Sequence, residues 1–399
     1  MSPSQPARTG PGALDGVVVV DLSRMLPGGY ASALLADLGA RVVKVEQPGT
    51  GDQVRTMPPL TAGGRSGLHA NLDRGKASIA LDLRHPEGRA VLLDLLVRAD
   101  VLVESFRPGV LDRLELGEDV LSTSFPRLVH VAISAYGPDG PYATRPGHDI
   151  DALAYAGVLA GTGARGGPPV LPGVQVADLA AGLQAVVGAL AALTERARSG
   201  RGQRVDVAMS DAALSLQLLG AGAAAVGVEY GPGAGPLTGG MACYRVYRCA
   251  DGRYVALGAL EPKFFARTCE LLGIAEVADW QLDPTRQEEL AGRLAGVLAT
   301  RTRDEWAALA AGEETCLAPV LDVAEALADP NAVARGSVRT VDLGDGTLGP
   351  LLMPVVRLAR TPAGAGAIPQ PLGRQTDQVL ADLGYGPERV AALRAAGVL

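Results

Sequence analysis

The stretch from Gly16 to Pro48, GVVVVDLSRMLPGGYASALLADLGARVVKVEQP, decides the fold class of this sequence. Val17–Val20 is a continuous run of β-branched residues, which is typical of a strand buried on both faces. Ala31–Leu38 is rich in helix-forming residues, and Arg41–Glu46 returns to the strand pattern. A strand, a loop, a helix and a second strand in this order indicate a βαβ unit with parallel strands.

The same alternation continues along the chain. Further strands are predicted at Ala77–Leu83, Val101–Glu104, Leu128–Ser134 and Gln203–Met209, and the main helices at Pro86–Arg98 and Gln175–Arg198. These elements predict an α/β fold, with a Rossmann-like parallel sheet covered by helices on both faces. The loop after the first strand, SRMLPGGYA, lacks the G-x-G-x-x-G spacing, so we expect a Rossmann-like domain whose ligand is not a dinucleotide.

Composition and turn signals divide the chain into segments. We predict a flexible leader at residues 1–15, a large α/β domain at 16–210 and 335–399, a linker at 211–240 and a small α+β domain at 241–334. The linker contains the glycine-rich run GPGAGPLTGG. Asp251-Gly252 and Asp345-Gly346 each predict the turn of a β-hairpin, and two short helices are expected in the C-terminal tail. The small domain is thus expected as an insertion between two pieces of the large one.

The composition argues against several classes of protein. Of 399 residues, 48% are hydrophobic and 4% aromatic, and the net charge is −7, which disfavours global disorder and a nucleic-acid-binding surface. The four cysteines form no C-x-x-C pair and accompany no histidine cluster, so we expect no metal site and reduced thiols in the cytoplasm. The leader lacks the apolar core of a signal peptide. The most apolar stretches, Ala177–Leu193 and Ala212–Val228, are rich in small residues and are interpreted as buried interface helices rather than membrane spans.

Three titratable residues are candidates for chemistry. His148, one of four histidines, follows a Pro-Gly break and precedes an apolar helix. It is either an inert member of a helix cap or a general acid–base, because the pKa of histidine normally lies near neutrality. Asp178 stands near the start of a long helix. It is either an acid placed there because the helix dipole favours negative charge, or a carboxylate shielded from water, whose proton affinity is raised into a useful range. Glu261 opens a helix of the small domain, which is an ordinary place for a glutamate.

Basic residues gather in two stretches, with Arg74, Lys76 and Arg84 in the first and Arg107 and Arg113 in the second. Most lysines and arginines of globular proteins lie solvated at the surface. Both stretches nevertheless border predicted strand ends, and open parallel sheets bind ligands at the carboxyl edge of their strands. A phosphorylated ligand at this edge is therefore the alternative interpretation.

Six segments of the sequence together resemble the CaiB/BaiF family, the family III CoA-transferases. They are ADLGARVVKVEQPGTGD, ESFRPGVLDRLELG, GPDGPYATRPGHDIDALAYAGVL, VADLAAGLQAVVGALAAL, SGRGQRVDVAMSDA and QTDQVLADLGYGPERVAALRAAGV. The texts GHDI and ALGALEPKFF resemble the α-methylacyl-CoA racemase branch, in which a His and an Asp flank the α-carbon of the thioester and a Glu supports the His. The matching residues here are His148, Asp178 and Glu261.

The resemblance also implies a coenzyme A site on the Rossmann-like domain. Its contacts are expected at Leu81, Asp82, Leu83, Arg84, Ser105, Phe106, Arg107, Arg113, Gly147 and Asp149. Racemase relatives can carry an arginine where this chain has Gln47, so a phosphate contact at that position stays open. Family members form interlocked homodimers with the active site between subunits. The CoA thioester is the substrate, so no separate cofactor and no metal are expected.

The resemblance therefore predicts a racemase that interconverts the R and S forms of 2-methylacyl-CoA thioesters. A thioester makes its α-hydrogen removable, because the charge moves onto oxygen as an enolate. His148 on one face and Asp178 on the other would each act as acid and base in turn, and Glu261 would orient His148. The alternative is a CoA-transferase in which Asp178 attacks the thioester and forms an aspartyl-CoA intermediate. A CoA-binding protein without turnover is the third interpretation.

Overall fold

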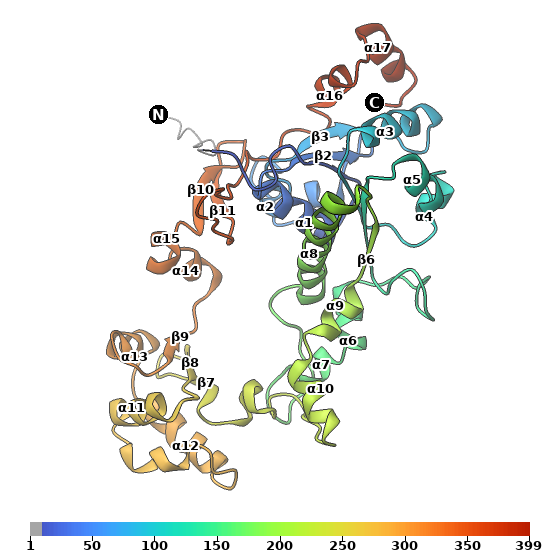
Figure 1. Cartoon of the computed structure of the whole chain (residues 1–399). Helices are drawn as coiled ribbons and strands as arrows, with labels where there is room; N and C mark the ends of the chain where they lie inside the picture. The colour runs from blue at the N-terminus through green and yellow to red at the C-terminus, as the bar shows by residue number, and fades with distance from the viewer. Residues whose placement is uncertain (1–9) are drawn as a thin grey trace. The chain divides into compact units, whose positions relative to one another are not determined.

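The computed structural model describes residues 10–399, which form two compact units (Figure 1). The first unit contains the described residues up to Ala152, together with Gln175–Ala213 and Pro330–Leu399. The second contains Leu153–Val174 and Leu214–Asp329. The sequence prediction assigns Leu153–Val174 to the large domain, whereas this segment contacts the second unit, for example through an ion pair between Arg165 and Glu288.

A six-stranded sheet forms the centre of the first unit. Its strands are β1 (Val18–Asp21), β2 (Arg41–Glu46), β3 (Ala77–Ala80), β4 (Val101–Glu104), β5 (Val129–Ser134) and β6 (Arg204–Ala208). All neighbouring pairs are parallel, in the order β3-β2-β1-β4-β5-β6. The predicted parallel sheet is confirmed, and its order reverses direction between β1 and β4, as in doubly wound folds.

Helices cover both faces of this sheet because successive strand residues point to opposite sides. Val20, Val43 and Leu102 belong to one apolar core with α3 (Pro86–Val97) and the C-terminal helices α16 (Thr376–Asp382) and α17 (Pro387–Ala395). The alternate residues Val19 and Val42 are equally buried but lie outside that core. The other face packs against α1 (Met25–Asp37) and α8 (Val176–Ser199).

Helix α1 begins at Met25, earlier than the predicted start at Ala31. The prediction treated the Pro-Gly-Gly segment as a loop. Pro27 is compatible with the first turn of the helix, because amides there have no partner within the helix. The consequence is that the loop between β1 and α1 is short and places Ser23 and Arg24 directly at the end of β1.

Helix α8 is the one described helix that is long and apolar enough, by length and composition, to cross a membrane. The core helix of a globular protein meets the same test. Ala177, Ala181, Ala185 and Ala189 are all buried and recur on one side of α8. These small side chains allow α8 to pack closely against α1 and the sheet.

Shorter elements complete the first unit. They are the 3₁₀ turn η1 (Gln53–Thr56), α2 (Gly67–Leu72), α4 (Val110–Arg113), α5 (Glu118–Ser124), α6 (Asp149–Tyr155, which continues into the second unit), α9 (Met209–Ser215), α15 (Pro330–Ala334), β10 (Val338–Asp342) and β11 (Leu348–Leu352). The predicted hairpin at Asp345-Gly346 is present, with β10 and β11 antiparallel. The predicted packing of the C-terminal helices against the body is also present, because Val379, Leu393 and Val398 lie in the core.

The second unit is built on the antiparallel sheet β7-β8-β9. Its elements are α7 (Val158–Gly161), α10 (Leu218–Ala225), the irregular turn η2 (Pro236–Gly240), β7 (Tyr244–Arg248), β8 (Tyr254–Gly258), α11 (Pro262–Leu272), the 3₁₀ turn η3 (Ala275–Trp280), α12 (Gln287–Leu298), α13 (Arg303–Ala310), β9 (Leu317–Pro319) and α14 (Val323–Leu327). The predicted Asp251-Gly252 hairpin joins β7 to β8. The predicted linker, residues 211–240, contains α10 and is therefore partly helical.

The predicted leader, residues 1–15, lies outside the described residues as far as residue 9. Its described end is attached to the body: Leu14 is buried, and its backbone N–H donates to the carbonyl oxygen of Leu38 at 3.0 Å. The globular part of the chain thus begins before residue 16.

Candidate active site

An open groove of about 990 Å³ lies at the carboxyl ends of β1, β2, β3 and β4. Its walls come from the segments that follow each of these strands, beginning at Leu22, Gln47, Leu81 and Ser105. The edge where strand order reverses is the place where open α/β sheets bind ligands. The volume suits a ligand of nucleotide size.

Most of the predicted coenzyme A contacts line this groove. They are Leu81, Leu83, Arg84, Ser105, Phe106, Arg107 and Arg113, and Gln47 lines it as well. Asp82 is not part of the lining, but its carboxylate accepts two hydrogen bonds from the Arg84 guanidinium, each at 3.0 Å. Gln47 also bonds to Asp82. The sequence analysis did not select Arg24, which lines the groove and lies over the Phe106 ring.

The groove has an excess of available positive charge. The guanidinium groups of Arg24, Arg107 and Arg113 have no carboxylate partner among the described residues. The two acids of the lining, in contrast, are already paired: Glu46 with Arg55 at 2.6 Å and Asp52 with Lys44 at 2.9 Å. Guanidinium groups without partners are suited to binding phosphate.

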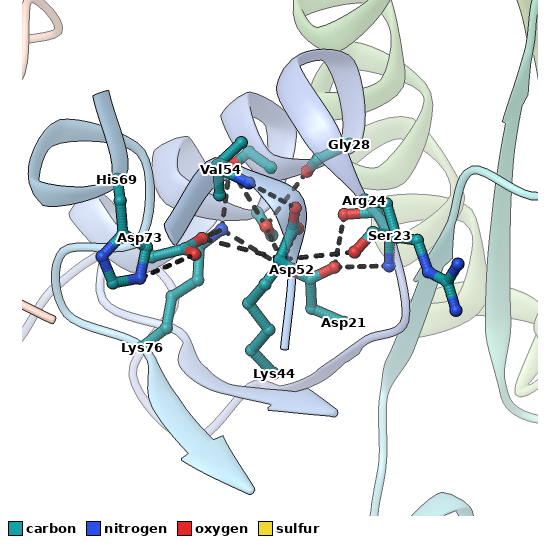
Figure 2. A network of polar contacts seen from close by, with 12 residues as sticks. Asp21, Ser23, Arg24, Gly28, Lys44, Asp52, Val54, His69, Asp73 and Lys76 are labelled. Carbon is teal, nitrogen blue, oxygen red and sulfur yellow. Dashed lines mark hydrogen bonds and ion pairs between the residues drawn. The ribbon is translucent and has the colours of Figure 1, made fainter. Parts of the chain in front are cut away.

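A buried network of charges lies beside the groove (Figure 2). The Lys44 ammonium is 2.9 Å from a carboxylate oxygen of Asp52 and donates to the Ser23 carbonyl oxygen at 3.1 Å. The Lys76 ammonium donates to Asp73 at 2.7 Å and to Asp21 at 3.2 Å. Asp52 in turn accepts from the backbone N–H groups of Val54 and Met25. The network thereby holds two segments that border the groove, the start of α1 and the turn η1.

The lysines dominate the electrostatics of this network. Burial alone would raise the pKa of Asp73, but the nearby charges of Lys44 and Lys76 outweigh it and hold that pKa well below its usual range. The pKa of Asp21 is lowered in the same way against the effect of burial. Burial lowers the pKa of His69 to about 4, so His69 is neutral near pH 7. Because their pKa values are lowered, Asp21 and Asp73 are both ionised at neutral pH.

Arg74 and Lys76, two of the basic residues noted in the sequence, lie neither at the solvated surface nor in the groove, the two places that the sequence analysis considered for them. Arg74 is 6% exposed and pairs with Asp37, and Lys76 is 6% exposed within the network. Neither is solvated surface and neither lines the groove. One signal for the network was present in the sequence: Lys44 interrupts the apolar run of a central strand, and a charge there must be paired.

His148 lies at the junction of a loop with α6, as the sequence predicts. Its carbonyl oxygen accepts from the backbone N–H groups of Asp151 and Ala152, and its own N–H donates to the Asp151 carboxylate at 2.9 Å. His148 is therefore the N-terminal capping residue of α6, while its imidazole is exposed. The cap is made by the backbone, so the ring is available for another role.

The residues on either side of His148 are held firmly. Gly147 packs against Tyr136, and a Cβ atom at this position would lie 2.8 Å from the Tyr136 hydroxyl oxygen. Asp149 directs its carboxylate toward the start of α8: Oδ1 accepts from the backbone N–H of Ala177 at 2.7 Å and of Asp178 at 3.1 Å. Neither residue belongs to the lining of the groove. The His148 loop and the start of α8 are thus joined directly.

Asp178 occupies the first turn of α8 and is partly buried. Burial, and secondarily the charge of Asp149, raise the pKa of Asp178 to about 7. A carboxyl group with this pKa exists in both protonation states near neutral pH. It can therefore accept and donate a proton in the same pH range.

Glu261 belongs to the second unit, where it is the N-terminal capping residue of α11. Its carbonyl oxygen accepts from the backbone N–H groups of Phe264 and Phe265, and its side chain is exposed. The predicted role of Glu261 as the partner of His148 stays a prediction.

Among residues 10–399 there is no group of three or more His, Cys, Asp or Glu side chains arranged to hold a metal ion. Three of the cysteines, Cys243, Cys249 and Cys269, are buried, and Cys316 is exposed. All four are free thiols.

A family model described as CoA-transferase family III matches residues 14–376. The chain belongs to this family. The match spans the groove, the His148 junction, Asp178 and Glu261, so every candidate residue lies within the family III region. The resemblance to the CaiB/BaiF family found in the sequence motifs is confirmed.

Individual relatives of this family III chain differ in the reactions for which they are named. An acyl-CoA transferase of Fusarium pseudograminearum (strain CS3096) is 36% identical over 413 residues, covering 99% of this chain and 90% of the relative. Human alpha-methylacyl-CoA racemase is 35% identical over 385 residues, covering 96% of each chain. The crystal structure of a CAIB/BAIF family protein from Brucella suis matches with a TM-score of 0.82 at 32% identity, covering 94% of this chain and 100% of that one.

Proposed function

We propose that this family III protein is an acyl-CoA racemase that interconverts the R and S forms of 2-methylacyl-CoA thioesters. One of its two acid–base groups removes the α-hydrogen from one face of the thioester, and the other returns a proton to the opposite face. The intermediate is an enolate, in which the negative charge rests on the thioester oxygen. His148 and Asp178 are the two groups, and Glu261 supports His148.

The observation that carries this proposal is the junction between the His148 loop and the start of α8. Asp149, the neighbour of His148, bonds directly to the backbone of Asp178. Asp178 has a pKa of about 7, raised by burial and by Asp149. A proton-exchanging carboxyl beside a histidine-bearing loop suits two-base chemistry at neutral pH, since each group must act both as acid and as base.

The groove supplies the binding site for the coenzyme A part of the substrate. Arg24, Arg107 and Arg113 are suited to its phosphates, because within residues 10–399 no carboxylate pairs with them. Arg84 borders the same groove and is mostly exposed. The thioester is itself the substrate, and the proton transfers proposed for His148 and Asp178 call on no further cofactor.

The second candidate function is CoA transfer between carboxylic acids, with Asp178 as the nucleophile. The 36% identity to a relative named acyl-CoA transferase favours it. That role needs Asp178 ionised, whereas its pKa of about 7 leaves a large part of the carboxyl protonated at neutral pH. A pKa near 7 suits the proton exchange of a racemase, in which the same group must act as acid and as base.

Deuterium exchange in D₂O separates the two functions. The protein is incubated with a pure R or S 2-methylacyl-CoA and no free acid, and label at C2 and the stereochemistry are followed by NMR and chiral chromatography. A racemase gives deuterium at C2 together with inversion. A transferase gives no label under these conditions, but moves CoA once a second carboxylic acid is added.

The variants His148→Ala and Asp178→Asn assign the roles. Each is expected to lower exchange by roughly 10²–10⁴-fold, the usual contribution of a positioned acid or base. An exchange rate like that of the unmodified protein in His148→Ala would remove the histidine from the mechanism. Loss of CoA transfer in Asp178→Asn, without any exchange in the parent protein, would establish the second function instead.

We further propose that the protein acts in the cytoplasm as a homodimer, interlocked as in the family resemblance, with acyl-CoA as its ligand and without nucleic-acid or membrane partners. Apolar side chains on α8, such as Leu183 and Val187, are exposed in the single chain, which supports a second copy covering them. Light scattering of the purified protein at several concentrations tests the dimer.

A further inference from the structure

The side chain of Asp149 has a defined structural partner that lies far from it in sequence. Oδ1 accepts hydrogen bonds from the backbone N–H groups of Ala177 and Asp178, which belong to the first turn of α8. Amides in a first turn have no acceptor within their own helix. The residue that precedes α8, Gln175, provides no side-chain cap. Asp149 therefore supplies from another element the cap that α8 lacks locally.

The same contact brings a second carboxylate close to Asp178. Of the described charged groups, Asp149 is the one with a resolved effect on the pKa of Asp178, and its effect adds to that of burial. The other titratable or charged side chains on the elements that meet at this junction are Tyr30 and Asp37 on α1, His130 on β5, Arg204 and Asp206 on β6, His148, Asp151 and Tyr155 at α6, and Glu195, Arg196 and Arg198 near the far end of α8. No cation with a resolved effect offsets Asp149, unlike the lysines of the buried network.

We propose that Asp149 is a positioning residue of this site: its carboxylate holds the start of α8, and with it Asp178, against the His148 loop and adds a second negative charge beside the Asp178 carboxyl. The coenzyme A contact expected at Asp149 from the family resemblance stays a prediction. The inference rests on the proposed function insofar as Asp178 carries a proton in the reaction. The geometry of the cap is independent of the reaction.

Two substitutions separate the two parts of this role. Asp149→Asn keeps an oxygen that accepts from the α8 amides but removes the charge. Asp149→Ala removes both the acceptor and the charge. Asp151→Asn is the matched control, because Asp151 is a carboxylate of the same junction that accepts from the His148 N–H. Asp151 has no resolved effect on the pKa of Asp178.

The experiment measures the titration of Asp178 directly, by NMR of the full-length protein labelled with ¹³C at aspartate carboxyl carbons. The Asp178 signal is assigned by its absence in Asp178→Asn. We expect its midpoint near pH 7 in the parent protein. In Asp149→Asn the midpoint should fall by about one pH unit, because a like charge has been removed. Asp151→Asn should leave the midpoint within about 0.3 units of the parent value.

The pH profile of C2 exchange gives the second measurement. Its limb that reports Asp178 should move to lower pH in Asp149→Asn, while the KM for the thioester stays within about twofold. Asp149→Ala should lower kcat further, since the start of α8 is no longer held, and Asp149→Asn should recover most of that loss at its own optimal pH.

The outcomes distinguish this inference from the proposed function. An Asp178 midpoint that is the same in the parent protein and in Asp149→Asn overturns the inference, whatever the activity. A midpoint that moves in a protein that catalyses no exchange supports the inference and rejects the racemase function. Because Asp149→Asn preserves the cap, the titration remains measurable even if Asp149→Ala does not fold.

Discussion

The first unit contains two sets of carboxylates that are shielded from water, and their proton affinities move in opposite directions. Burial acts to raise the pKa of Asp73 and of Asp178 alike. Lys44 and Lys76 reverse this effect at Asp73, whereas Asp149 reinforces it at Asp178. At Asp73 the neighbouring positive charges outweigh burial, whereas at Asp178 burial is the larger cause of the raised pKa and the negative charge of Asp149 adds to it.

The largest effect on stability is expected from Lys44→Met. The network holds three carboxylates, Asp21, Asp52 and Asp73, against two ammonium groups. Removing one ammonium leaves buried negative charge without a partner, and breaking a buried ion pair in this way costs about 3–5 kcal/mol. Urea-induced unfolding at pH 7 measures the loss. Because protonation relieves the unpaired carboxylates, the loss should be smaller at low pH.

Lys263→Met is the control for this substitution. Lys263 is an exposed lysine of the second unit, and removing a surface charge changes stability by less than about 0.5 kcal/mol. Equal stability of the Lys44→Met and Lys263→Met proteins would mean that the network does not hold the first unit together.

At Asp178 the change in the free energy of unfolding should have the opposite sign: Asp178→Asn should stabilise the protein above neutral pH. The pKa of Asp178 is raised in the folded state to about 7, so folding favours its protonated form. That contribution is fully present below the unfolded pKa of an aspartate and is lost as the pH rises through about 7. Asparagine stays neutral, so at pH 8 we expect a gain of at most about 4 kcal/mol in the free energy of unfolding, from a shift of about three pH units.

Thermal unfolding across pH checks this expectation. The two proteins should have similar midpoints below about pH 4, where Asp178 is protonated in both the folded and the unfolded state, and should diverge from there up to about pH 7, above which the difference is constant. Asp151→Asn should show no such divergence. A difference between parent and Asp178→Asn that is constant from pH 5 to pH 8 would contradict the assigned environment of Asp178.

A smaller effect is expected from Asp73→Asn. This change leaves two carboxylates and two ammonium groups in the network, so the charges balance. The asparagine oxygen can still accept from Lys76, and its amide nitrogen can face His69 Nε2, which lies 3.4 Å from the present Asp73 oxygen. We expect a loss of about 1 kcal/mol in the urea experiment. A loss as large as that of Lys44→Met would show that charge balance does not govern this network.

The contrast between the two sites also explains how far the sequence alone could predict them. The βαβ alternation, the hairpin turns and the junction at His148 depend on local patterns, and the structure contains them all. The partners of Lys44 come from Asp21, Asp52 and Asp73, and the partner of Asp149 lies at the start of α8. Such pairings depend on which strands, helices and loops are neighbours in the folded chain. Composition and periodicity carry no information about this. For the same reason Arg74 and Lys76 could be recognised as basic but not as buried.

The smallest effect on stability is expected at the edge of the groove, from Arg84→Ala. The Arg84 side chain is 74% exposed and forms a direct ion pair with Asp82 at the surface. Ion pairs exposed to solvent contribute little to the free energy of folding. Its unfolding midpoint should therefore match that of Arg41→Ala, a control that breaks the exposed pair of Arg41 with Asp382 outside the groove. Binding of coenzyme A, measured by calorimetry at two salt concentrations, should differ: about 5–10-fold weaker in Arg84→Ala, with a reduced salt dependence, and unchanged in Arg41→Ala. Equal affinity of the two variants would place the phosphates away from Arg84 and closer to Arg24, Arg107 and Arg113.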